Sequence, residues 1–290
     1  MKKISSYIWD YRLSYLGAVL SLLIAVTLDM AAPRLTARVV DDVIVGGNMG
    51  ELKFLLLGFL GVGLGRCIFQ YVKEYTFDKN GARISGDMRR DLFRHIQSLS
   101  ADFFDRTNTG ELMARVKEDI DHIWDAVGYV GMLLIEVGYH TAIILVCMCM
   151  IHWKLAMISA AAMLLCGIVA VVMERKLGAV YEEISEENAV LNTVAEENLG
   201  GVRTVKAFAR EAFEIGKFLS HNKRYYDLNM AQSKVLVRYY PIFTVITTVL
   251  PLLTLLVGGR FVIDGEMTLG QLTAFVEYSM NIVWPMEMLG

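Results

Sequence analysis

The residues VGYVGMLLIEVGYHTAIILVCMCMI, from Val127 to Ile151, form one long apolar run that is almost free of charge. A second run, LAMISAAAMLLCGIVAVVM, extends from Leu155 to Met173 and begins only three residues later. The hydrocarbon core of a bilayer is about 30 Å thick, and about 20 helical residues cross it. Each run therefore predicts a transmembrane helix, and the short connection between them predicts a turn outside the membrane.

Four further apolar segments occur along the chain, two on each side of this pair. The first is extended past Pro33 because Leu35, Val39 and Val43 recur at helical spacing. All six together predict an all-α fold, a polytopic membrane protein with six long transmembrane helices in one domain over residues 1–290. The spans are expected at about 15–44, 52–72, 127–151, 154–173, 237–258 and 268–285.

The overall composition is consistent with a membrane protein. Hydrophobic residues make up 55% of the chain, charged residues make up 20%, and the formal net charge is −3. Soluble domains carry about 25% charged residues. A surface that binds nucleic acid needs an excess of Lys and Arg, so nucleic acid is not expected as a partner.

The basic residues indicate the orientation of the spans. Most of those outside the spans lie in the N-terminal segment and in two long connections, 73–126 and 174–236. Because basic residues favour the cytoplasmic side, we expect both long connections and both termini to be cytoplasmic, in the plasma membrane. A cleaved signal peptide over the first span is an alternative. Its apolar run, however, ends in Asp29, Met30 and Pro33 without a small-residue cleavage pattern.

Both long connections carry amphipathic helix patterns. Apolar residues recur at intervals of three and four from Leu112 to Val127 and from Leu191 to Val205. About 25 additional residues would extend each membrane helix by roughly 35 to 40 Å before the chain turns back. The membrane helices are therefore expected to continue into the cytoplasm and to end in tips.

The two tips contain local interruptions. At the first, SADFFDRTNTGE (Ser100–Glu111) predicts a short helix capped by Ser100 and a new helix that starts at Asn108. At the second, Gly200 and Gly201 interrupt the helical pattern.

No catalytic motif is present in the sequence. A phosphate-binding loop needs GxxxxGK[ST], and the nearest fragment, Gly216-Lys217, is followed by Phe218 in a helical pattern. HExxH, CxxC and GxSxG are also absent from the sequence. We therefore predict no catalytic, cofactor-binding or metal-binding residue. Packing is the expected role of the four cysteines, which lie in predicted spans: Cys67, Cys147, Cys149 and Cys166.

Three stretches in order along the chain resemble the transmembrane domain of exporter-type ABC transporters. They are LSADFFDRTNTGELMARVKEDID (Leu99–Asp121), EENLGGVRTVKAFARE (Glu196–Glu211) and GEMTLGQLTAF (Gly265–Phe275). The resemblance extends from the N-terminal segment to Pro285. It implies that two such domains pair, as a homodimer or a heterodimer.

The resemblance also implies coupling helices at the tips, at about Ser100–Arg106 and Ala207–Glu214, that dock onto nucleotide-binding domains. ATP and Mg²⁺ would belong to that domain, which these residues do not include, so the chain is expected to be a fragment or one subunit of an ATP-hydrolysing translocase. The residues implied in coupling are Asp102, Phe103, Phe104, Asp105, Arg106, Phe208, Ala209, Arg210 and Glu211.

Polar residues within the spans predict a substrate path. Charged side chains inside a membrane are energetically unfavourable and usually face the helix bundle or a cavity. Glu136 and His140 lie one helical turn apart. Thr273, Glu277 and Asn281 recur every four residues and form a stripe along the sixth span. The alternative is structural, with the acidic groups bonded to Arg66 or His140 between helices. The candidates are Arg66, Glu136, His140, Thr273, Glu277 and Asn281.

Three charged residues flank Pro33 in the first span: Asp29, Arg34 and Arg38. Because proline disturbs a helix, we expect a kink there, with the three charges at the outer membrane interface.

The sequence thus predicts the transmembrane half of an ATP-driven exporter. Its substrate, an unidentified lipid, drug, peptide or metabolite, would leave the cytoplasm or the inner leaflet. A membrane receptor or scaffold whose cytoplasmic helices recruit a partner is an alternative, and so is a channel. Membrane lipid is an expected partner in each case, and ATP-dependent flux separates the exporter from the other two.

Overall fold

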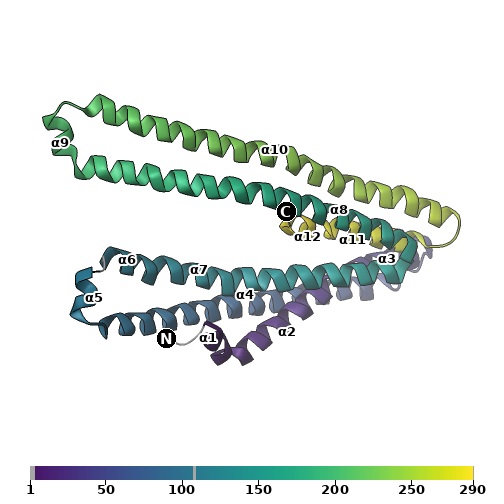
Figure 1. The fold of residues 1–290 in the computed structure, drawn as a ribbon. Coiled ribbons are helices and arrows are strands. Elements are labelled where there is room, and N and C mark those ends of the chain that lie inside the picture. Colours follow the sequence, from purple (N-terminus) through teal and green to yellow (C-terminus); the bar gives the residue numbers. More distant parts are fainter. Residues whose placement is uncertain (1–3, 107–108, 290) are drawn as a thin grey trace. The chain divides into compact units, whose positions relative to one another are not determined.

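The structure is a computed structural model that describes residues 4–106 and 109–289. Within these residues every regular element is a helix, which confirms the prediction of an all-α membrane protein (Figure 1). Four helical stretches among them are long and apolar enough to cross a membrane. They are Arg12–Val45, Leu52–Gln97, Arg115–Gly200 and Glu211–Ile263.

The chain forms two compact units. One runs from the first described residues to Ala156 and includes Thr254–Ile282, and the other comprises Met157–Leu253 and the described residues from Val283. In chain order the elements are α1 (Ile4–Asp10), α2 (Arg12–Asp29), α3 (Ala32–Arg38), the π-helical η1 (Val39–Val45), α4 (Leu52–Gln97), α5 (Ala101–Arg106), α6 (Thr109–Ala114), the π-helical η2 (Arg115–Asp119), α7 (Ile120–Asp125), the π-helical η3 (Ala126–Val130), α8 (Gly131–Gly200), α9 (Val202–Ala207), α10 (Glu211–Ile263), α11 (Leu269–Asn281) and α12 (Val283–Leu289).

Two long helical stretches are interrupted, and a third helix ends before its predicted limit. α8 consists of two helices, because the backbone at His152 leaves the helical region with φ −156° and ψ 103°. The helix is interrupted between α2 and α3, just before Pro33. Pro33 lies in the first turn of α3, where its missing N–H is tolerated. The helix predicted to end at residue 285 already ends at Asn281.

The first unit is held together by α2, which packs along α4. Phe77 of α4 is buried with Leu22 of α2, and its ring meets that of Tyr15 edge-on at 5.5 Å. Further along α4, a Cβ on Gly81 would lie only 2.4 Å from the Trp124 ring, so α7 approaches α4 closely because residue 81 is glycine. Each large apolar side chain buried in this way stabilises the unit by about 1.5–3 kcal/mol.

The second unit contains the part of α8 that follows Met157, with most of α10 alongside it (Figure 1). Polar contacts join these two helices. Gln232 Nε2 donates to the Tyr181 hydroxyl at 2.9 Å. The buried Glu187 carboxylate lies 2.7 Å from His221 Nδ1 and 3.1 Å from Arg224 Nε.

Candidate functional site

The first predicted site residue, Arg66, lies on α4 and contacts neither Glu136 nor Glu277. Its guanidinium donates to the carboxylate of Asp29 at the end of α2. The Arg66 side chain is 54% exposed and that of Asp29 is 22% exposed, so water reaches this pair. The charge of Arg66 is therefore compensated between α2 and α4.

Glu136 on α8 forms a more deeply buried ion pair with Lys73 on α4. Lys73 Nζ lies 2.8 Å from Glu136 Oε2 and 3.0 Å from Glu74 Oε1, and the Lys73 side chain is only 1% exposed. A buried cation of this kind is tolerated only because it is paired and hydrogen-bonded. Along α4, Lys73 lies about 32 Å from the first residue of the helix. This length is close to the thickness of the hydrocarbon core of a membrane.

Sequence reasoning missed Lys73, because a lysine directly after an apolar run was assigned to the connection. A signal for it was available, since an acidic residue within a span requires a cation nearby. His140 lies one turn from Glu136 on α8, is buried, and interacts electrostatically with Asp29, Glu136 and Arg66. The structure therefore gathers charged groups from α2, α4 and α8 into one cluster.

The predicted stripe on α11 lies apart from these ion pairs. Thr273, Glu277 and Asn281 are all half-buried. Thr273 Oγ1 donates to the Leu269 carbonyl at 3.0 Å. Among the residues that the structure describes, the side chains of Glu277 and Asn281 form no hydrogen bond or ion pair. The structure does not join this stripe to the charged cluster.

The first tip contains α5, at the position where a short helix was predicted. Asp102 is exposed, and the rings of Phe103 and Phe104 meet edge-on at 5.6 Å. Phe103 also lines a cavity of about 440 Å³ whose other walls include residues of α1, α4, α6, η2 and α7. The side chains of Asp105 and Arg106, and the helix start predicted at Asn108, lie outside the described part of the chain.

The second tip differs from its prediction in position. The short helix was expected at about Ala207–Glu214, whereas α9 spans Val202–Ala207. Phe208, Ala209 and Arg210 form the turn that follows. Ala209 has a φ of 51°, which ends the helical path, and α10 begins with Glu211.

The side chains of this turn are accessible in the second unit. Phe208 is 74% exposed. The Arg210 guanidinium lies 5.2 Å from the centre of the Phe213 ring, within the range of a cation–π contact.

Comparison with known proteins identifies this architecture. Residues 15–286 match the family described as the ABC transporter transmembrane region. The chain belongs to this family.

Three relatives illustrate the range of this family of transmembrane regions. An uncharacterized ABC transporter ATP-binding protein of Bacillus subtilis, YknU, is 25% identical over 289 residues, which are 100% of this chain and 49% of that protein. A putative multidrug export ATP-binding/permease protein of the same bacterium, YgaD, is 28% identical over 297 residues, covering 100% of this chain and 51% of that protein. The ATP-dependent lipid A-core flippase of Desulfotalea psychrophila is 26% identical over 280 residues, 95% of this chain and 48% of the flippase.

This ABC transporter transmembrane region therefore spans about half the length of the curated relatives it matches. The names of the last two relatives describe drug export and lipid flipping by the whole proteins. The family assignment agrees with the long apolar helices, and it leaves the substrate open.

Proposed function

We propose that this chain is the membrane-crossing half of an ATP-driven exporter whose two tips receive the motion of nucleotide-binding domains. The observation that carries this proposal is the length of the helices. α4 has 46 residues and α10 has 53, which correspond to roughly 69 and 80 Å, against a hydrocarbon core of about 30 Å. More than half of each helix extends beyond the membrane and ends at a tip, where a soluble motor domain can dock.

The described residues provide no site for the nucleotide. The sequence contains no phosphate-binding loop, and the described residues contain no cluster of His, Cys, Asp and Glu that would hold a metal ion. We therefore assign ATP and Mg²⁺ to the nucleotide-binding domain and derive no step of hydrolysis from these residues. The role of this chain is to bind that domain and to convert its movement.

In this proposal the chain crosses the plasma membrane six times, with both termini and both tips in the cytoplasm. The break at His152 supplies the turn between the third and fourth crossings. A second transmembrane domain, identical or related, would cover part of the apolar surface that one copy leaves exposed, and membrane lipid would cover the rest.

The substrate path is proposed along α11, because its polar stripe is half-buried and two of its three members are not engaged with other described residues. Glu136 is assigned a structural role in its ion pair with Lys73. Glu277→Gln should change the substrate preference of transport or its pH dependence. If both stayed unchanged, the result would contradict a substrate path along α11.

The tips provide the principal test. Phe104→Ala and Phe208→Ala should preserve basal ATP hydrolysis in reconstituted vesicles but lower ATP-dependent transport of a fluorescent phospholipid or a cationic dye. The larger loss is expected for Phe208, because its ring is the more exposed. Phe93→Ala serves as the control, since Phe93 is a half-exposed aromatic on α4 before the tip.

Normal transport per ATP hydrolysed in both tip variants would contradict the coupling role. Probe flux that does not require ATP would indicate a channel. Binding of a partner without any flux would indicate a receptor or scaffold.

A further inference from the structure

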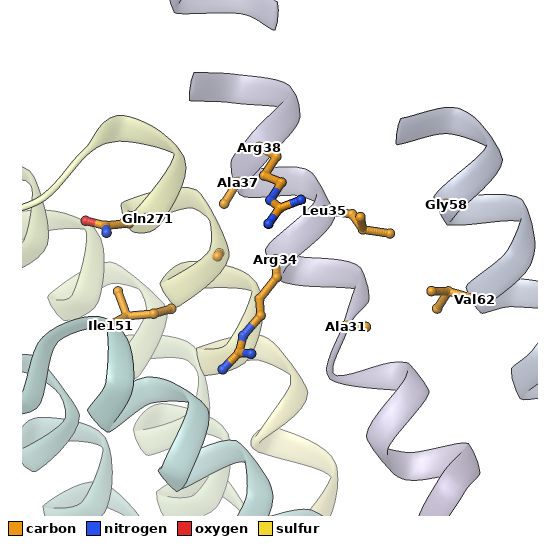
Figure 2. A pocket seen from close by; sticks show the side chains of 10 residues that line it. Ala31, Arg34, Leu35, Ala37, Arg38, Gly58, Val62, Ile151 and Gln271 are labelled. Carbon is orange, nitrogen blue, oxygen red and sulfur yellow. The ribbon is translucent and has the colours of Figure 1, made fainter. Parts of the chain in front are cut away.

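An open cavity of about 480 Å³ lies within the first unit, bordered by α3, α4, α8 and α11 (Figure 2). Most of its lining is apolar, with Leu35, Val62 and Ile151 as the larger side chains. Two cationic side chains, Arg34 and Arg38, also line it. A cavity of this size accommodates part of an organic ligand.

The two arginines lie one turn apart on α3, so their like charges share a face and repel each other. The neighbours of Arg34 are neutral: its Nη2 lies 3.5 Å from Met150 Sδ and 3.8 Å from Cys147 Sγ, and it interacts with the Tyr278 hydroxyl. Neither arginine forms an ion pair with any residue in the described part of the chain. Both charges are thus uncompensated beside an apolar cavity.

The acid nearest in sequence to these arginines is engaged elsewhere. Asp41 of η1 accepts hydrogen bonds from Thr268 Oγ1 at 2.6 Å and from the Gly270 N–H at 2.8 Å, at the start of α11. Gln271 also lines the cavity, and its side-chain oxygen accepts from the Thr268 N–H at 3.0 Å. The Gln271 amide nitrogen therefore remains as a third hydrogen-bond donor beside the two arginines.

The cavity lies close to the ends of its helices. Gly58 is six residues from the start of α4, Gln271 is two residues from the start of α11, and Ile151 is next to the break at His152. These residues lie within about 10 Å of the helix ends. In a membrane, this depth is near the boundary between headgroups and acyl chains.

We propose that this cavity binds an anionic phospholipid. The phosphate is held by Arg34 and Arg38, and an acyl chain lies against the apolar wall. Guanidinium groups bind phosphate through paired, charge-assisted hydrogen bonds, and a bound anion relieves the repulsion between the two arginines. This inference goes beyond the proposed function, because it holds whatever the protein transports.

Native mass spectrometry of the delipidated protein tests the proposal with three probes: phosphatidylglycerol, phosphatidylcholine of the same acyl chains, and glycerol 3-phosphate. Phosphatidylglycerol should bind at least about tenfold more tightly than the other two. The double variant Arg34→Gln/Arg38→Gln should lose at least about tenfold in affinity for it. Lys53→Gln, which removes an exposed positive charge near the same end of α4, should change that affinity less than about twofold.

A variant that keeps both arginines provides an independent check. A Cβ on Gly58 would lie 3.5 Å from the Leu35 methyl groups, so Gly58→Leu should fill the apolar part and weaken phosphatidylglycerol binding. Equal binding of the two lipids, or unchanged binding by the double variant, would overturn the proposal. Glycerol 3-phosphate binding as tightly as phosphatidylglycerol would instead assign a site for soluble phosphate and exclude the lipid.

Discussion

Two helical hairpins carry the tips. In the first, α4 and α6–α8 flank α5, and in the second, α8 and α10 flank α9 (Figure 1). The two hairpins differ in how each is supported by its own unit. The first is braced by the N-terminal segment: Tyr7 is buried with Ile84 and Met88 of α4 and Ile120 of α7, and its hydroxyl donates to Asp91 at 2.9 Å. Near the second tip, Leu199 and Phe208 are about three-quarters exposed. One tip is thus stabilised within its own unit, whereas the other presents apolar surface to whatever docks there.

A buried charge in each hairpin shows the same difference. Lys73 has acidic partners and is almost completely buried. Glu187 is also buried, but the side chains of its partners His221 and Arg224 are 31% and 70% exposed. Loss of the buried charge therefore leaves a largely buried, unpaired carboxylate in the first hairpin, whereas it leaves partly or largely exposed partners in the second.

The largest expected effect follows from this contrast. Lys73→Met should lower the free energy of unfolding by about 3–5 kcal/mol, because it leaves Glu136 buried without its cation. Glu187→Leu should lower it by less than about 1 kcal/mol, because its partners His221 and Arg224 stay in contact with water. Thermal unfolding in detergent measures both.

A rescue variant serves as the control. Lys73→Met combined with Glu136→Leu should recover most of the lost stability, because no unpaired charge remains. Equal losses for Lys73→Met and Glu187→Leu would remove the contrast between the hairpins.

Deletion of the residues up to Asp10 should make the first hairpin resemble the second. The deletion removes the buried Tyr7 side chain and its hydrogen bond, so amide hydrogen exchange in residues 84–97 should accelerate at least about tenfold. Residues 187–199 provide the internal reference and should exchange as before. Acceleration of equal size in both segments would indicate general destabilisation rather than loss of a brace.

A smaller effect is expected from the two phenolic hydrogen bonds of this brace. Tyr7 donates to Asp91, and Tyr11 donates to Asp87 at 2.8 Å. Tyr7→Phe and Tyr11→Phe should each lower the free energy of unfolding by about 1 kcal/mol. Tyr226→Phe, an exposed phenol on α10, is the matched control and should have no measurable effect.

The same two phenols make the brace sensitive to alkaline pH. Burial and the bond to Asp91 raise the pKa of Tyr7, and the hydrogen bond to Asp87, with burial, raises the pKa of Tyr11. Because the folded pKa lies above the ordinary value of about 10, this stabilisation is complete below pH 10 and is lost as pH rises through the folded pKa. The stability difference between the parent and Tyr7→Phe should therefore disappear in strongly alkaline buffer, and a constant difference would contradict this account.

The apolar runs and helix periodicities predicted the helical membrane fold and the first tip, because these features depend on local sequence. The ion pair between Lys73 and Glu136 was not predictable in this way. Its partners are 63 residues apart, and the pair depends on which faces of α4 and α8 meet.

The second tip shows a different limit of prediction. Gly200 and Gly201 correctly indicated a break after α8, yet the end of α9 depends on a positive φ at Ala209. Alanine rarely adopts this conformation, so the residue type gives no warning of it. The predicted helix was therefore placed about five residues too late.

Photo-crosslinking at the tips tests the central claim most directly. p-Benzoylphenylalanine would replace Phe208, Phe104 or, as the control, Phe93 in the complete transporter, and the adducts would be identified by mass spectrometry. The account predicts adducts with nucleotide-binding domain peptides at Phe208 and Phe104, and none at Phe93. Adducts confined to lipid or to this chain at both tips would contradict the docking of a motor domain there.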